Sequence, residues 1–179
     1  MSVELEEFSL RHFIPQFREF NSAVQDNGTR LQPYFWWARG NNMARCKFIW
    51  RSVVSEKIAR AFHDLPYNKK FIIRTDGNFA GAIGLDGVCQ NAARAELWIF
   101  MTREYAGQNV ASRAIKLIEE YAAQQSIKKI YARVSYGNWL SRRMLQKNDY
   151  TIYKTSLNQL HGTVEQFWSK TLPIKNIEK

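Results

Sequence analysis

The stretch that most constrains the fold runs through residues 95–112, where a buried strand pattern passes through a loop of small residues into an amphipathic helix. The loop spans residues 103–109, and the helix pattern begins at Val110. This arrangement points several backbone N–H groups and the positive end of the helix dipole at one place. We therefore expect an anion to bind there.

Hydrophobic periodicity and turn residues predict the other elements. The helices are expected from Pro15 to the pair Asn27-Gly28, over 43–63, from Val110 to about Ser126, and over 138–147. The strands are expected over 3–11, 71–74, 79–86, 93–101, 129–134, 150–157 and 164–172. Asp76-Gly77-Asn78 predicts a hairpin turn, and Gly81 and Gly84 predict close approach of a neighbour or ligand. The aromatic segment 30–37 is expected to be a loop or short helix over an apolar surface.

This order of elements predicts an α/β fold with a mixed sheet, in one domain covering residues 1–179. The chain has 179 residues, of which 45% are hydrophobic and 14% aromatic, so a packed core is expected. No apolar run is long enough to span a membrane, and residues 1–7 are acidic, which favours a cytoplasmic protein. Cys46 and Cys89 are expected to be free, buried or half-buried thiols. His12, His63 and His161 are widely separated, and no metal site is predicted; His161 with Gly162 fits a hairpin turn.

The formal charge of +10 favours anionic partners such as nucleic acid, ribosomes or a phosphorylated cofactor, and disfavours polycationic substrates. Part of that charge is solvated terminus, since Lys175, Glu178 and Lys179 lie in the tail. The basic residues interleaved with aromatics over 30–51 leave open an RNA-binding or ribosome-binding module. An apolar lid with solvated charges is the alternative interpretation of the same segment.

Several segments resemble the GNAT superfamily of acyl-CoA-dependent N-acetyltransferases, and in particular the Rim-type branch that acetylates protein N-termini. The segments are 79–85, 94–100, 104–114, 138–141 and 148–150, together with the aromatic loop around Pro33 and Trp37. The resemblance implies a GNAT-type fold, a strongly twisted mixed sheet flanked by helices, with acetyl-CoA as the cofactor. The superfamily signature Gln/Arg-x-x-Gly-x-Gly/Ala falls on residues 106–111, where Ala106 and Asn109 depart from it. Asn is the residue other than Gly that best tolerates a left-handed backbone, so the loop can keep its shape.

The resemblance also implies which residues contact coenzyme A. For the pantetheine arm these are Phe100, Met101 and Thr102, and for the pyrophosphate they are Gly107, Gln108, Asn109, Val110, Ala111 and Ser112, with Asn138 alongside. Backbone donors with little side chain in the way approach a pyrophosphate closely, which is the physical reason for small residues in such a loop. Asn138 is also expected to cap the helix that follows it.

Acetyl transfer to an amine requires a neutral amine, support for the oxyanion and protonation of the departing thiolate. Backbone N–H groups where two strands splay, near residues 97–100, are expected to contact the oxyanion and to hold the pantetheine arm. Glu96 is the candidate base or amine-positioning carboxylate, and a strand carboxylate that faces solvent or pairs with an Arg is the alternative. Many superfamily members carry a tyrosine acid where this chain has Leu145, whereas Rim-type enzymes resemble it in having a serine at Ser141. The Ser141 hydroxyl is the candidate donor to the thiolate, directly or through water; an ordinary helix serine is the alternative.

An α-amine has a pKa of about 7.7–8.0, whereas that of lysine is about 10.4. An α-amine is therefore partly neutral near pH 7 and needs only a weak base. The sequence therefore favours a protein N-terminus as acceptor, with possible partners on the ribosome. A small-molecule acetyltransferase acting on polyamines or antibiotics, or a catalytically degenerate RNA-binding or ribosome-binding module, remains an alternative. Monomer and homodimer are both open.

Overall fold

The computed structural model describes residues 1–61, 65–89, 91–159 and 162–173. The predictions for His63, His161 and the tail lie outside these residues. In chain order the elements are β1 (Val3–Glu7), α1 (Phe13–Asp26), α2 (Gly28–Leu31), α3 (Trp36–Arg39), α4 (Asn42–Ala61), β2 (Tyr67–Thr75), β3 (Asn78–Cys89), β4 (Arg94–Met101), α5 (Val110–Gln124), β5 (Lys129–Ser135), α6 (Trp139–Lys147), β6 (Thr151–Asn158) and β7 (Thr163–Thr171).

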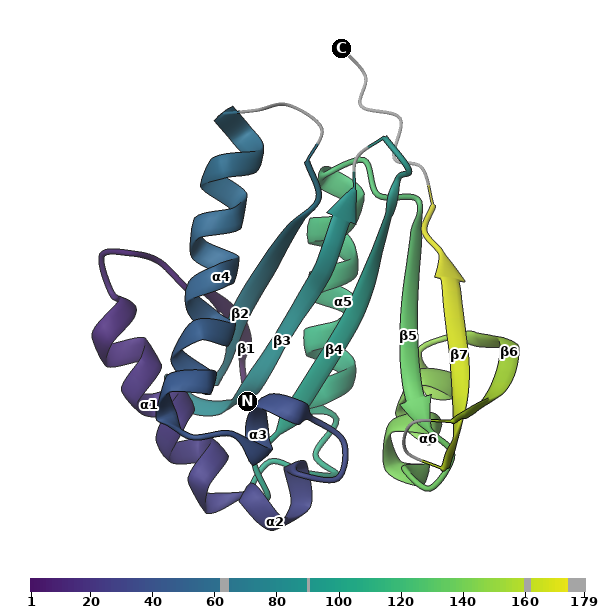
Figure 1. Cartoon of the computed structure of the whole chain (residues 1–179), viewed down its shortest axis with the longest axis horizontal. Helices are drawn as coiled ribbons and strands as arrows, with labels where there is room; N and C mark the ends of the chain where they lie inside the picture. Colours follow the sequence, from purple (N-terminus) through teal and green to yellow (C-terminus); the bar gives the residue numbers. More distant parts are fainter. Residues whose placement is uncertain (62–64, 90, 160–161, 174–179) are drawn as a thin grey trace.

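The predicted α/β fold with a mixed sheet is confirmed. Over the described ranges, the strands form one seven-stranded sheet in the order β1-β2-β3-β4-β5-β7-β6. Strands β4 and β5 pair in parallel, and the other neighbouring strands pair antiparallel. Figure 1 shows α5 behind the sheet and α1 and α4 on the opposite side, where they cover β2 and β3. None of the helices in these ranges is both long and apolar enough to cross a lipid bilayer.

The predicted helices and strands are present, and the largest difference in length lies in the β2–β3 hairpin. Strand β2 begins at Tyr67 rather than at residue 71. Lys69 and Lys70 make this part of the strand look like a loop in the sequence, yet both are buried. Lys69 Nζ lies 2.6 Å from carboxylate oxygens of Glu7 and Glu56, so its charge is paired inside the fold.

The turn of this hairpin was predicted correctly. Asp76 and Gly77 have φ angles of 48° and 82°, which is the left-handed pair that a two-residue hairpin turn requires. The prediction for Gly81 and Gly84 is also confirmed. A Cβ on Gly81 would collide with the backbone oxygen of Phe100, and one on Gly84 would lie 2.6 Å from Trp98 Nε1. Both glycines therefore let β3 and β4 lie close together.

Each face of the sheet has its own apolar cluster. Buried residues of α5 such as Ile115 and Ile118 pack on one face with Ile83 and Ile130. The other face carries a cluster that is rich in aromatic residues and is covered by the N-terminal helices. Because side chains alternate along a strand, successive residues of β4 belong to different clusters.

Three residues of the aromatic segment 30–37 belong to the second cluster, namely Leu31, Phe35 and Trp37. Trp37 is 2% exposed, and its ring centroid lies 5.0 Å from that of Phe48 and 5.7 Å from that of Phe100. Tyr34, in contrast, is exposed. The observed packing agrees with an apolar lid over the sheet, since rings that fill a core are not available to stack on bases.

Candidate functional site

The candidate site begins where β4 and β5 separate. Residues 94–96 pair with residues 129–131, and the register between the two strands ends there although both strands continue. On the β5 side, the remaining residues of β4 therefore have backbone N–H and C=O groups that are not paired with β5. A divergence of two parallel strands opens the sheet at one place.

The hydrogen bonds to β3 show which backbone groups of β4 face this opening. Thr102 N–H donates to the Ala80 carbonyl at 2.9 Å. In an antiparallel pair such bonds recur at every second residue, so Phe100 also directs its backbone toward β3, and Ile99 and Met101 direct theirs toward the opening. The Met101 carbonyl accepts a hydrogen bond from Arg30 Nη2, which agrees with this orientation.

These contacts separate the three residues predicted for the pantetheine arm. The backbone N–H of Met101 faces the opening, whereas the Thr102 N–H donates a hydrogen bond to β3. Phe100 is 3% exposed, and its side chain lies in the aromatic cluster. Ile99 lies within residues 97–100, where backbone N–H groups are expected to contact the oxyanion and the pantetheine arm. The alternation along β4 selects Ile99 from that range once the partner of each backbone N–H is known.

Residues 102–112 form the segment that we call the cofactor loop. Gly107 has φ +83°, and no atom lies within 4 Å of the place where its Cβ would stand. Asn109 has φ 62° and ψ 4°, so it adopts the left-handed conformation that the sequence predicted for it. Both residues turn the chain so that α5 begins at Val110.

The first turn of α5 leaves free backbone donors beside this loop. The first helical bond is donated by Arg113 N–H to the Asn109 carbonyl at 3.2 Å. The N–H groups of Val110, Ala111 and Ser112 therefore precede the helical ladder and point along its axis. The side chain of Gln108 is held within the loop, because its amide nitrogen Nε2 donates to the Glu104 carbonyl at 2.8 Å.

One cation near the loop was missed by the sequence reasoning. Lys147, at the end of α6, donates from Nζ to Asn109 Oδ1 at 2.6 Å. Lys147 is 38 residues from Asn109 in the chain, and no sequence signal connects them. A second contact, from Asn148 Nδ2 to Ser112 Oγ at 3.1 Å, also joins α6 to the start of α5.

Asn138 and Ser141 lie at the start of α6. Asn138 is the N-cap, and its Oδ1 accepts a hydrogen bond from the Ser141 backbone N–H at 3.2 Å, so the predicted capping role is confirmed. Such a cap stabilises a helix by about 1 kcal/mol. The Ser141 side chain is half-buried. Leu145 is 1% exposed and belongs to the core of the α5 face.

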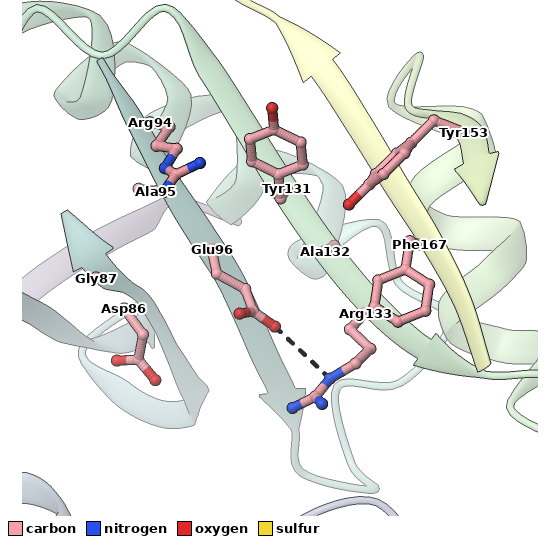
Figure 2. A pocket seen from close by; sticks show the side chains of 10 residues that line it. All are labelled: Asp86, Gly87, Arg94, Ala95, Glu96, Tyr131, Ala132, Arg133, Tyr153 and Phe167. Atoms are coloured by element: carbon pink, nitrogen blue, oxygen red, sulfur yellow. Dashed lines mark ion pairs between the residues drawn. The ribbon is translucent and has the colours of Figure 1, made fainter. Parts of the chain in front are cut away.

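Glu96 lies on the opposite face of the sheet from α5, between Asp86 of β3 and Tyr131 of β5. Its side chain is 52% exposed, and its Oε1 lies 3.9 Å from Arg133 Nε, as Figure 2 shows. Partial burial raises the pKa of Glu96, Arg133 lowers it, and Asp86 and Glu165 raise it again, with a net increase. A carboxylate with a raised pKa is a better proton acceptor at neutral pH.

Glu96 lines a cavity of about 570 Å³ that we call the cleft. The cleft is lined by Asp86, Gly87, Arg94, Ala95, Glu96, Tyr131, Ala132, Arg133, Tyr153 and Phe167. Tyr131, Tyr153 and Phe167 form an aromatic wall. The ring centroids are 5.6 Å apart between Tyr131 and Tyr153 and 6.3 Å apart between Tyr153 and Phe167.

Among the described residues, no cysteine or histidine lines the cleft, although Cys89 pairs with Arg94 in the β3–β4 ladder. Cys46 and Cys89 are free and half-buried, as predicted. Within the ranges that the structure describes, no three His, Cys, Asp or Glu residues come together as potential metal ligands. The cleft lining includes the carboxylates of Asp86 and Glu96, the hydroxyls of Tyr131 and Tyr153, and the guanidinium groups of Arg94 and Arg133.

Comparisons with known proteins identify the family. The model of the acetyltransferase (GNAT) domain matches residues 17–151. No curated protein sequence matches the chain significantly. Among solved structures, RimL, a ribosomal alpha-N-protein acetyltransferase in complex with coenzyme A, is 14% identical with a TM-score of 0.80, over 98% of this chain and 97% of that one.

Two other solved structures have the same fold. The microcin self-immunity acetyltransferase MccE, in complex with acetyl-CoA and AMP, is 17% identical with a TM-score of 0.77, over 94% of this chain and 92% of that one. Spermidine N-acetyltransferase from Vibrio cholerae, in complex with CoA and spermine, is 14% identical with a TM-score of 0.70, over 95% of each chain. Since the family model covers most of the sequence and these folds agree with it, the chain belongs to the GNAT family of acetyltransferases.

Proposed function

We propose that this GNAT acetyltransferase transfers the acetyl group of acetyl-CoA to the α-amine at a protein N-terminus. The observation that carries the proposal is Glu96, a half-exposed carboxylate of raised pKa in the cleft, combined with buried Leu145 at the place of the family's tyrosine acid. A site with one moderate base suits an amine whose own pKa is near 8, because about 7.7–8.0 is the ordinary range for an α-amine.

The cofactor loop fits the phosphates of coenzyme A. Gly107 keeps the loop free of side-chain atoms, and residues 110–112 offer N–H groups at the positive end of α5. Lys147 adds a cation beside Asn109, and the signature position occupied by Ala106 lacks one. We assign Gly107, Val110, Ala111 and Ser112 to the pyrophosphate, with Lys147 beside them.

Bound acetyl-CoA supplies the acetyl group as a thioester. In the proposed reaction Glu96 accepts a proton from the α-ammonium group, which leaves a neutral amine in the cleft. The N–H groups of Ile99 and Met101, which face the opening between β4 and β5, are placed to donate to the oxyanion. Ser141, at the start of α6, donates a proton toward the departing sulfur, and Asn138 fixes the helix turn that carries it.

The activities of the solved neighbours support an amine acceptor, since RimL acts on a ribosomal protein α-amine and the Vibrio cholerae enzyme on spermidine. The charge of +10 supports an acceptor on the ribosome. One continuous sheet supports a single domain over residues 1–179. An RNA-binding module has less support, because Trp37 and Phe48 are buried, and of the other aromatic residues in the segment 30–51 Tyr34 and Trp50 are exposed.

The test uses the purified full-length protein with acetyl-CoA and three acceptors at equal concentration. These are a peptide with a free N-terminus and no lysine, a peptide with a blocked N-terminus and one lysine, and spermidine. We expect acetyl-CoA to raise the melting temperature and only the first peptide to be acetylated efficiently. Acetylation of the lysine peptide or spermidine without the first peptide would reject the acceptor. A protein that shows no thermal shift with acetyl-CoA would reject the enzyme and favour a binding module.

A further inference from the structure

The cleft differs from an ordinary amine-binding site in the cations that surround it. Arg94 and Arg133 line it directly, and both are exposed. Lys129 Nζ lies 5.4 Å from the ring centroid of Tyr131, and Lys154 Nζ lies 5.4 Å from that of Phe167. Because both rings belong to the aromatic wall, these lysines stand at its edge. We call Arg94, Lys129, Arg133 and Lys154 the basic rim.

The carboxylates in and beside the cleft compensate the positive charge of the basic rim to different extents. Asp86 is paired with Lys70, whose Nζ lies 3.0 Å from Asp86 Oδ1 and whose side chain is 1% exposed. Glu165 accepts a hydrogen bond from Asn158 Nδ2 at 3.2 Å and lies 4.0 Å from Arg133. Glu96 lies at a similar distance, 3.9 Å, from the same Arg133. An arginine held loosely between two carboxylates is easily drawn to a new anion.

With Asp86 matched by Lys70, the cations of the basic rim outnumber Glu96 and Glu165. The arrangement is therefore acidic at one point, Glu96, and basic around it. An ammonium group is attracted to Glu96, but a second cation on the same acceptor would lie against the basic rim. An anion on the acceptor would instead meet several cations and draw the acceptor into the cleft.

The sheet gives the distance at which that anion is expected. At the level of Glu96, β4 and β5 are still paired, and the residue of β6 three strand spacings away is Thr151. Lys154 is level with Arg133, two residues further along the strands. Three spacings of about 4.8 Å across the sheet and about 7 Å along it make about 16 Å. An extended peptide covers about 3.4 Å per residue, so this distance corresponds to roughly four to five residues. Lys129, on β5, is closer to Glu96.

We propose that the cleft selects acceptors that carry an anionic group close to the reactive amine, namely protein N-termini with acidic side chains among the first four residues. This inference rests on the proposed function, because it assigns the cleft to the acceptor. The N-terminal ammonium lies at Glu96, apolar parts of the first residues contact the aromatic wall, and acidic side chains meet the basic rim. Polyamines, which carry a second cation, are poor substrates for the same reason.

The experiment compares three peptides of equal length with the same first residue and with Glu, Gln or Lys at the next three positions. For the full-length enzyme with saturating acetyl-CoA, we expect kcat/KM to decrease in the order Glu, Gln, Lys, with about a tenfold difference between the first and last at low salt. The difference should nearly vanish in 1 M NaCl, where the Debye length is about 3 Å. Calorimetric affinities of the corresponding N-acetylated peptides should follow the same order.

A pair of charge reversals separates the cleft from the overall charge. Lys154→Glu alters the basic rim. Arg18→Glu makes the same change of net charge at an exposed position of α1, a helix that contacts α4 and β3 and lies far from β6. We expect Lys154→Glu to bring the Glu-to-Lys preference close to unity and Arg18→Glu to leave it. Equal rates for the three peptides, or equal effects of the two variants, would overturn the selectivity and leave the proposed function standing. If no peptide is acetylated and spermidine is, the proposed function itself fails.

Discussion

In the proposed function, the cofactor loop and the cleft have different roles and use different parts of the chain. The loop is one continuous segment, residues 102–112, and it offers backbone N–H groups whose direction is set by Gly107 and Asn109. The cleft is made of side chains from five strands, β3 to β7. Changes in the loop should therefore act through backbone geometry on cofactor affinity. Changes around the cleft should act through charge and proton transfer on turnover and acceptor choice.

The largest expected effect is that of Gly107→Val on the loop. A β-branched residue disfavours φ +83°, so the loop must change its conformation and lose N–H groups directed at the phosphates. Losing two hydrogen bonds to a charged group, at about 1.5 kcal/mol each, raises the Kd for acetyl-CoA about 100-fold. Titration calorimetry with acetyl-CoA measures this effect.

Gly77→Val is the matched control for this substitution. Gly77 has φ +82°, and like Gly107 it has no atom within 4 Å of the Cβ position, but it lies in the β2–β3 turn. Both variants should lose similar stability, about 1–2 kcal/mol, as judged by thermal unfolding. Only Gly107→Val should lose affinity for acetyl-CoA. Similar affinities in the two variants would remove the loop from cofactor binding.

An intermediate effect is expected for Ser141→Ala in the first turn of α6, the substitution that tests the proposed proton donor. The cap of α6 uses the backbone N–H of Ser141, so the helix should survive the loss of the hydroxyl. If that hydroxyl donates to the developing thiolate, kcat falls about tenfold, as for one hydrogen bond to a charged group. The Kd for acetyl-CoA should stay within about twofold, as it should for a surface substitution.

Single-turnover rates with a peptide acceptor and calorimetric affinities check the Ser141→Ala prediction together. Ser156→Ala, a change of another half-buried serine on strand β6, serves as the control. Full activity of Ser141→Ala would leave this serine without a part in the reaction. A loss of acetyl-CoA affinity equal to the loss of rate would instead place Ser141 with the cofactor loop.

The loop was predictable from the sequence, because its signals are local. Gly107 and Asn109 stand directly before an amphipathic helix, and the tolerance of Asn for a left-handed backbone needs no tertiary information. The hairpin turn at Asp76 and Gly77 was predicted on the same basis. In each case the residues that determine the backbone conformation are close together in the sequence.

The cleft was mostly not predictable, because its residues meet only through the strand order. Glu96 was a candidate, but Arg133, Tyr153 and Phe167 come from three strands whose neighbours depend on the crossover order β5-β7-β6. Buried Lys70 illustrates a further reason. A lysine in a strand looks like a loop or surface residue until its partner, Asp86, is known.

The smallest effect is expected for Asp86→Asn, as a shift of the pH profile. This variant tests whether Glu96 in the cleft is the base. Asp86 faces Glu96 across the β3–β4 ladder, and its negative charge raises the pKa of Glu96 beyond the effect of partial burial. Removing that charge lowers this pKa, so Glu96 stays ionised to lower pH.

If Glu96 is the base, the acid limb of the kcat profile therefore moves to lower pH in Asp86→Asn, and kcat on the alkaline side of the limb changes little. Arg133→Gln should move the limb the opposite way, because Arg133 lowers the pKa of Glu96. The opposite signs matter, since both variants lose an ion pair and general destabilisation would shift them alike. Glu96→Gln should remove the limb altogether. A limb that stays at the same pH in all three variants would mean that the proton leaves the amine by another route, and that the cleft selects the acceptor without serving as its base.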